Sequence, residues 1–115
     1  MHYLFLVYPE PVALASERAA FEAACRANAA ALQASGYLLT AVSLLSSGPG
    51  VTLRVRGGEL SLAEGPSAAT AEPLAELYVI DARDLNEAIR LAADMPQARR
   101  ACIEIRPTAA PAGKE

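Results

Sequence analysis

The stretch LAELYVIDARDLNEAIRLA, residues 74–92, contains a strand signal followed closely by a helix signal. Leu74–Ile80 is an apolar run of strand length. Asp84 and Glu87 then have the spacing of a capping box, in which two side chains accept hydrogen bonds from free amides at the start of a helix. The apolar residues that follow recur at helical spacing and predict a short helix that stops before Pro96: Leu85, Ala88, Ile89 and Ala92.

The rest of the chain supplies the other elements. A long amphipathic helix is predicted over Glu17–Ser35, with Ser16 as its N-cap and Gly36 as the residue that ends it. A hairpin is predicted by the alternation of apolar and polar residues around Gly57-Gly58, which places Arg56 opposite Glu59. Short apolar runs predict three further strands, at His2–Tyr8, Tyr37–Leu45 and Ala101–Arg106.

With the hairpin set aside, the predicted order is βαββαβ, which is typical of a ferredoxin-like α+β fold. The chain of 115 residues is long enough for one core, so we expect a single domain over residues 1–107 and a flexible C-terminal tail over 108–115. Both helices should cover one face of a mostly antiparallel sheet. The other face is then open, and a small domain typically covers such a face with a second copy of itself.

Composition excludes several classes of function. Thirteen acidic and 10 basic residues give a net charge of -3, which argues against a nucleic-acid partner. No apolar run reaches the roughly 18 residues of a membrane span, and the N-terminal segment lacks the basic start of a signal peptide. Cys25 and Cys102 do not have the spacing of a disulfide framework or a zinc site. With one histidine and no glycine-rich phosphate loop, we expect a reduced, cytoplasmic protein without metal or cofactor.

Strand alternation predicts which side chains share the open face. On the last strand Ile103 and Ile105 should face the helices, and on the strand after residue 73 Leu77 and Val79 should do so. For the first strand the alternation allows either choice. If its residues 3, 5 and 7 face the helices, six polar side chains gather on the open face around an apolar cleft of the kind that binds small molecules: His2, Tyr8, Glu76, Tyr78, Glu104 and Arg106. Among them Glu76, Glu104 and His2 are candidate general bases, and Tyr8, Tyr78 and Arg106 are candidate ligand contacts.

Each candidate also has a purely structural interpretation. A histidine next to the N-terminus is commonly just solvated, as His2 would be. Glu104 and Arg106 lie two apart on one strand and could pair with each other or across a dimer interface. Glu76 is harder to dismiss, because a carboxylate in a central strand is costly to bury without a partner, although an arginine could supply one.

Several segments together resemble the YCII-related superfamily, and more closely its DGPF branch. They are the opening strand Tyr3–Tyr8, the hairpin TLRVRGGE at residues 52–59, and the C-terminal segments LYVID, DLNEA and IEIRP. The resemblance implies a ferredoxin-like domain that dimerises through its open sheet face as a dimeric α+β barrel, without a settled activity. The chain departs from the family at its motifs: Glu64-Gly65-Pro66-Ser67 replaces Asp-Gly-Pro-Phe, Ala71 replaces a common lysine, and Cys25 lies where the related YCII branch has a helix histidine.

We therefore expect a small homodimeric protein that binds a small molecule in a cleft on the helix-free sheet face. One alternative is an isomerase, lyase or hydrolase that uses a buried carboxylate as its general base. The other is a non-catalytic regulatory or accessory module that acts by protein contact. The sequence names neither substrate nor reaction.

Overall fold

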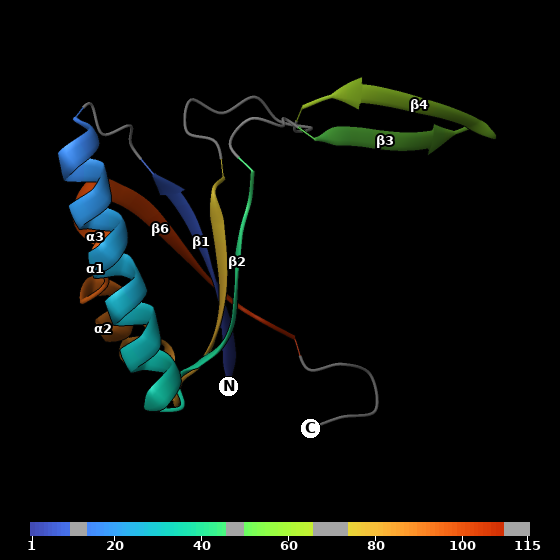
Figure 1. Cartoon of the computed structure of the whole chain (residues 1–115). Helices are drawn as coiled ribbons and strands as arrows, with labels where there is room; N and C mark the ends of the chain where they lie inside the picture. Colours follow the sequence, from blue (N-terminus) through green and yellow to red (C-terminus); the bar gives the residue numbers. More distant parts are fainter. Residues whose placement is uncertain (10–13, 46–49, 66–73, 110–115) are drawn as a thin grey trace.

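The computed structural model describes residues 1–9, 14–45, 50–65 and 74–109 (Figure 1). Its elements are, in chain order, β1 (His2–Pro9), α1 (Ala15–Ala34), β2 (Leu38–Ser43), β3 (Val51–Arg56), β4 (Glu59–Glu64), β5 (Glu76–Asp81), α2 (Leu85–Ala93), α3 (Gln97–Arg100) and β6 (Ala101–Pro107). All the predicted elements are present, with ends that shift by a few residues. The single-turn helix α3 was not predicted.

Four strands form the main sheet, in the order β2-β5-β1-β6, and every neighbouring pair is antiparallel. Without β3 and β4 this is a βαββαβ chain whose first strand lies between its third and fourth, the ferredoxin-like arrangement. The helices lie on one side of this sheet (Figure 1). The predicted fold class is confirmed, and among the described helices none combines the length and apolar character of a bilayer span.

The core lies between the sheet and the helices. Tyr3, Phe5 and Val7 of β1 are all buried, which settles the face of the first strand. The register pairs Tyr3 with Ile80 and Phe5 with Tyr78, so these two β5 residues share the helix-facing side, with exposures of 0% and 4%. Met95, Ala88 and Ala92 cover this layer from the α2 side.

The predicted faces of β5 are therefore wrong. Leu77 and Val79 were expected to face the helices, but they lie on the helix-free side, where Leu6 and Leu4 pair with them. Consequently Glu76 and Tyr78 do not share the open face with Tyr8, Glu104 and Arg106. The physical reason is that residues 77–80 are apolar at every position, so the sequence shows no alternation that distinguishes the two faces of the strand. Only the pairing of β5 with β1 determines the face on which each side chain lies.

The helix ends follow partly from local signals. Asp84 caps α2 by accepting a hydrogen bond from the Glu87 amide at 2.8 Å, and Glu87 Oε1 accepts from the Arg83 amide at 2.8 Å. This is the predicted capping box, displaced by one residue on its return bond. Gly36 follows α1 with a φ of 85°, as expected of the residue that ends it. The prediction of Ser16 as the N-cap was wrong, because the helix starts at Ala15, two residues earlier than predicted, and its N-cap Leu14 provides no side-chain cap.

The predicted hairpin β3–β4 is present, with Arg56 opposite Glu59 and positive φ angles at both Gly57 and Gly58. It is a separate two-stranded sheet that projects away from the main sheet on the side without helices (Figure 1). Of the DGPF-like segment, the structure describes Glu64 and Gly65, while Pro66, Ser67 and Ala71 lie outside the described residues. The predicted tail is described only to residue 109, and its first residue, Thr108, is bound to the His2 carbonyl through its amide at 3.0 Å.

Candidate functional site

The polar candidates are divided between the two sides of the sheet. On the helix-free side, the Tyr8 hydroxyl donates to Glu104 Oε1 at 3.3 Å, and Glu104 pairs with Arg106 at 3.8 Å. The Glu104 and Arg106 side chains are 45% and 67% exposed, so this is a solvated ion pair in the isolated chain. Burial and the charge of Glu104 raise the pKa of Tyr8.

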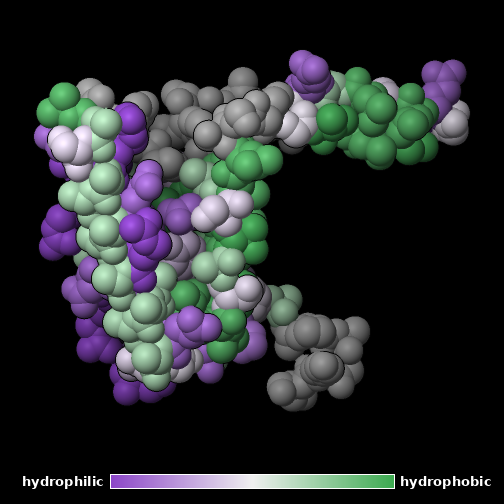
Figure 2. Space-filling model, viewed as in Figure 1, coloured by the Kyte–Doolittle hydropathy of each residue, from purple (hydrophilic) through white to green (hydrophobic). Residues whose placement is uncertain are grey.

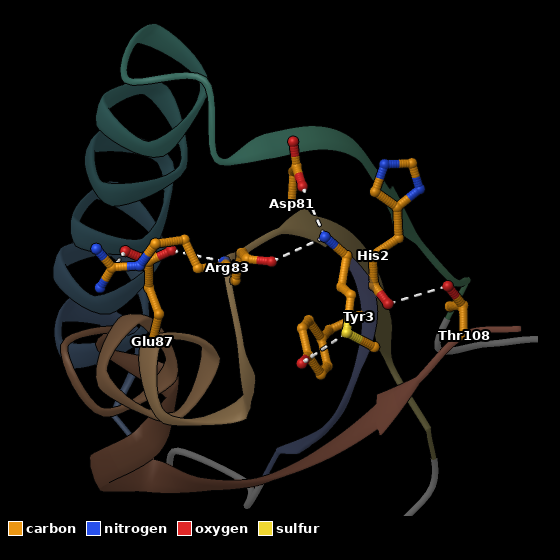
Figure 3. A network of polar contacts seen from close by, with 8 residues as sticks. His2, Tyr3, Asp81, Arg83, Glu87 and Thr108 are labelled. Atoms are coloured by element: carbon orange, nitrogen blue, oxygen red, sulfur yellow. Dashed lines mark hydrogen bonds and ion pairs between the residues drawn. The ribbon is translucent and has the colours of Figure 1, made fainter. Parts of the chain in front are cut away.

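His2 lies away from this group. Its strand partner is Asp81, whereas Tyr8 is at the opposite end of β1, next to Cys102. The imidazole is exposed and has no polar partner in the residues that the structure describes (Figure 3). The predicted combination of His2 with Glu104 at one site is not formed within the chain.

The helix side of the sheet contains a second polar group, which we name the Glu76 cluster: Glu76, Tyr78, Gln97 and Cys25. Gln97 Nε2 donates to the Tyr78 hydroxyl oxygen at 2.9 Å and lies 3.3 Å from Glu76 Oε1. The Tyr78 hydroxyl is 3.4 Å from Glu76 Oε2, to which it donates. Cys25 is the nearby thiol of α1, close enough for the Glu76 charge to act on it.

Three separate elements build this cluster. Glu76 and Tyr78 are two apart on β5 and therefore point to the same side of the sheet. Gln97 is the first residue of α3 and is 1% exposed, held between α2 and β6 by the turn at Pro96. Cys25 is half-buried on the inner side of α1.

Gln97 was missed by the sequence analysis. An isolated glutamine beside a proline has no pattern that distinguishes it from a surface residue, and only the packing of α3 buries it. Cys25 was considered for a disulfide or zinc site and as the family's histidine position, but not as a neighbour of Glu76, and Glu76 and Tyr78 were placed on the wrong face.

The electrostatics of the cluster keep its hydrogen-bond donors protonated at neutral pH. Burial, and then the charge of Glu76, raises the pKa of Tyr78 to about 12. Burial, and then the same carboxylate, raises the pKa of Cys25 to about 11. Both side chains are therefore neutral donors beside the Glu76 carboxyl group.

Two groups in the cluster lack ordinary partners. In the described parts of the chain Glu76 forms no ion pair, although it is half-buried. Gln97 Oε1 is buried and accepts no hydrogen bond. An exchange of its amide atoms would not help, because it would place the carbonyl oxygen against the Glu76 carboxylate. Unsatisfied buried polar atoms are uncommon in native proteins, and functional sites are one place where they occur.

An open pocket of about 380 Å³ lies at the other end of the helix side, lined by the start of β1, the turn after α1 and the start of α2. Its charged groups satisfy one another (Figure 3). The N-terminal ammonium donates to the Ala82 carbonyl at 3.0 Å and lies 3.5 Å from Asp81, while Arg83 pairs with Glu87 at 3.4 Å. We therefore assign this pocket a structural role. Within the described residues, no set of three potential ligand side chains could hold a metal ion.

The fold and the two polar groups define a small ferredoxin-like α+β domain with one solvated and one shielded polar site. The chain belongs to the YCII-related family, because the model of the YCII-related domain matches residues 1–109. It is similar in structure to 5-chloro-2-hydroxyhydroquinone dehydrochlorinase from Burkholderia phenoliruptrix AC1100, solved in complex with 2,5-dihydroxybenzoquinone. The TM-score is 0.59 at 14% sequence identity, with all of both chains covered. At that identity the likeness shows the shared fold. None of the curated proteins compared with it has a matching sequence.

Proposed function

We propose that this chain is a small homodimeric protein that binds a small molecule at the Glu76 cluster and transfers a proton through the Glu76 carboxylate. The observation that carries the proposal is the unpaired carboxylate on the shielded side of the sheet. A carboxylate removed from water costs free energy unless it is paired. The buried carboxylate of Glu87, by contrast, is paired with both Arg83 and Arg90. Within the described residues no cation is paired with Glu76, and its hydrogen-bond partners are the neutral side chains of Tyr78 and Gln97, which suits a group that must accept a proton.

The neighbours of Glu76 complete the chemistry. Tyr78 and Cys25 hold their protons at neutral pH; the Tyr78 hydroxyl donates its proton to the Glu76 carboxylate, and the Cys25 thiol can donate a hydrogen bond to a ligand oxygen. Gln97 orients the carboxylate and leaves its own carbonyl oxygen free to accept from the ligand. A base flanked by neutral donors suits an isomerase, lyase or hydrolase whose first step removes a proton from a carbon next to a carbonyl group or from an enol hydroxyl.

The proposed dimer uses the helix-free face. Leu4 and Leu6 of β1 lie opposite Val79 and Leu77 of β5, and Val42 of β2 extends this surface with 48% exposure. A partner that covers it would also shield the ion pair of Glu104 and Arg106. A cleft between two such faces, with Tyr8, Glu104 and Arg106 as ligand contacts, is the second candidate binding site. The Tyr8–Glu104 hydrogen bond favours it.

The two candidate sites are distinguished by fragment screening with protein-observed NMR. Fragments that bind the Glu76 cluster should shift the side-chain amide of Gln97 and the backbone amides of residues 76–78. Glu76→Gln keeps the shape and removes the charge, so these shifts should disappear in this variant and persist in the matched control Glu104→Gln. Fragments that shift Tyr8 and Arg106 instead would favour the second site. An absence of specific shifts at both sites would refute small-molecule binding and favour an accessory role through protein contact.

The activity is tested first with the substrate named for the structural neighbour, 5-chloro-2-hydroxyhydroquinone. Loss of HCl from this compound takes two proton transfers. One hydroxyl proton first moves to the chlorine-bearing carbon as the ring tautomerises to a ketone, and a base then takes a second hydroxyl proton while chloride leaves with the electrons of the C–Cl bond, which gives a hydroxybenzoquinone. We expect chloride release by the native chain to fall at least about a hundredfold in Glu76→Gln, the usual size of a lost general base. Equal rates in Glu76→Gln and Glu104→Gln would remove Glu76 from the mechanism.

A further inference from the structure

The β3–β4 hairpin has an apolar side that nothing in the described part of the chain covers. Its apolar side chains alternate with polar ones, so they lie on one side of the ribbon, and each is between 53% and 64% exposed: Val51, Leu53, Val55, Leu60 and Leu62. Figure 2 shows these apolar atoms gathered along the projecting arm. An isolated two-stranded hairpin is only marginally stable in water. The apolar side therefore needs a packing surface.

The shape of the chain shows where that surface must lie. The hairpin leaves one end of the main sheet and projects over its helix-free side, so arm and sheet enclose an open angle (Figure 1). The radius of gyration is 16.4 Å, whereas a compact chain of this length has one of about 13 Å. The angle has apolar groups on both sides, along the hairpin and on the main sheet, where Val42 of β2 lies beside Leu77 and is 48% exposed (Figure 2).

We infer that the β3–β4 hairpin is a clasp that packs its apolar side against a second copy of this chain, seated on the helix-free sheet face. The inference rests on the homodimer of the proposed function and adds to it the element that holds the two copies together. In a two-fold dimer each copy contributes one clasp, so the contact is made twice.

The area needed for a stable dimer supports the clasp. Four strands of about six residues present a face of roughly 400 Å², from the rise per residue and the strand spacing. Two such faces bury roughly 800 Å² in total, the size of a crystal-packing contact. Each hairpin adds roughly 200 Å² by the same geometry, which brings the total to about 1,200 Å² and into the range of specific interfaces.

The alternation within the hairpin provides a matched pair of variants. Leu53→Lys changes the apolar side, whereas Ser61→Lys places the same side chain on the polar side, opposite Arg54. Sedimentation velocity on the full chain should show a native particle of twice the 12.0 kDa chain mass. We expect Leu53→Lys to raise the dimer dissociation constant about tenfold or more, and Ser61→Lys to leave it within about threefold.

A second measurement does not depend on the folding of the lysine variant. Leu62→Cys, in a chain with Cys25→Ser and Cys102→Ser, is labelled with benzophenone maleimide and mixed with isotopically heavy native chain. Photo-crosslinks should join hairpin peptides of the labelled light chain to main-sheet peptides of the heavy chain. Suppose that light–heavy dimers form without such crosslinks and that Leu53→Lys leaves the dissociation constant unchanged. This result would refute the role of the hairpin as a clasp, while the homodimer itself would stand. A native particle of 12.0 kDa would overturn the clasp and the homodimer together.

Discussion

The raised pKa of Tyr78 makes a specific prediction about alkaline stability. In the folded chain Tyr78 is 4% exposed and has a pKa of about 12, against 10.0 for an unperturbed tyrosine. Between these two values the unfolded chain has lost the proton and the folded chain has kept it. Because the unfolded state then binds fewer protons, the free energy of unfolding decreases as the pH rises from 10 toward 12, and the contribution is fully present below pH 10.

The magnitude follows from the two pKa values. At pH 11 deprotonation stabilises the unfolded chain by about 1.4 kcal/mol through this tyrosine, and the folded chain by less than about 0.1 kcal/mol. The native protein should therefore lose about 1.3 kcal/mol between pH 8 and pH 11 from Tyr78 alone. Tyr78→Phe lacks the ionisable group, and its lower stability at pH 8 does not enter this difference.

The assay is urea unfolding of the native chain and Tyr78→Phe at pH 8 and pH 11, with the free energies extrapolated to water. Losses from Cys25 and other groups occur in both proteins and cancel. Between pH 8 and pH 11 the free energy of unfolding of the native chain should fall by about 1.3 kcal/mol more than that of Tyr78→Phe. Equal losses in the two proteins would show that Tyr78 titrates alike in both states, and that the described burial and contact with Glu76 do not exist in solution.

Three further outcomes are expected. Asp84→Ala removes the side-chain acceptor at the first turn of α2 and should cost about 1 kcal/mol in urea unfolding, so an unchanged midpoint would contradict the cap. Ile80→Ala should cost about 3 kcal/mol at a fully buried site, against less than about 1 kcal/mol for Ile89→Ala, which is 47% exposed; similar costs would place Ile80 outside the core. In a Cys102→Ser chain, the rate of alkylation of Cys25 by iodoacetamide should rise with a midpoint near pH 11, and a midpoint at or below pH 9 would refute its shielding beside Glu76.

Local sequence signals were enough to predict the helices and strands, because each of these signals depends on only a few neighbouring residues. The Gly57-Gly58 turn has one favourable geometry, and the pair of Asp84 and Glu87 satisfies amides within its own turn. The predicted N-cap of α1 is the exception: the helix begins at Ala15 after Leu14, which provides no side-chain cap, although serine is the stronger capping residue. The candidate site depends on longer-range information. Tyr78 and Glu76 changed face once β5 paired with β1, and Gln97 became a buried donor only through the placement of α3.

The amino-acid sequence alone determined the order of strands and helices, the hairpin and hence the ferredoxin-like class, because periodicity and turn chemistry act over a few residues. It also determined that Glu104 and Arg106 share the helix-free side, since Ile103 and Ile105 leave one choice of face. Only the tertiary structure decided which side of β5 is shielded from water, because residues 77–80 are apolar at every position and are equally suited to either face. That pairing, made between residues 69 to 79 positions apart, places beneath α1 a carboxylate that has no ion pair within the described residues, and thereby defines the candidate site.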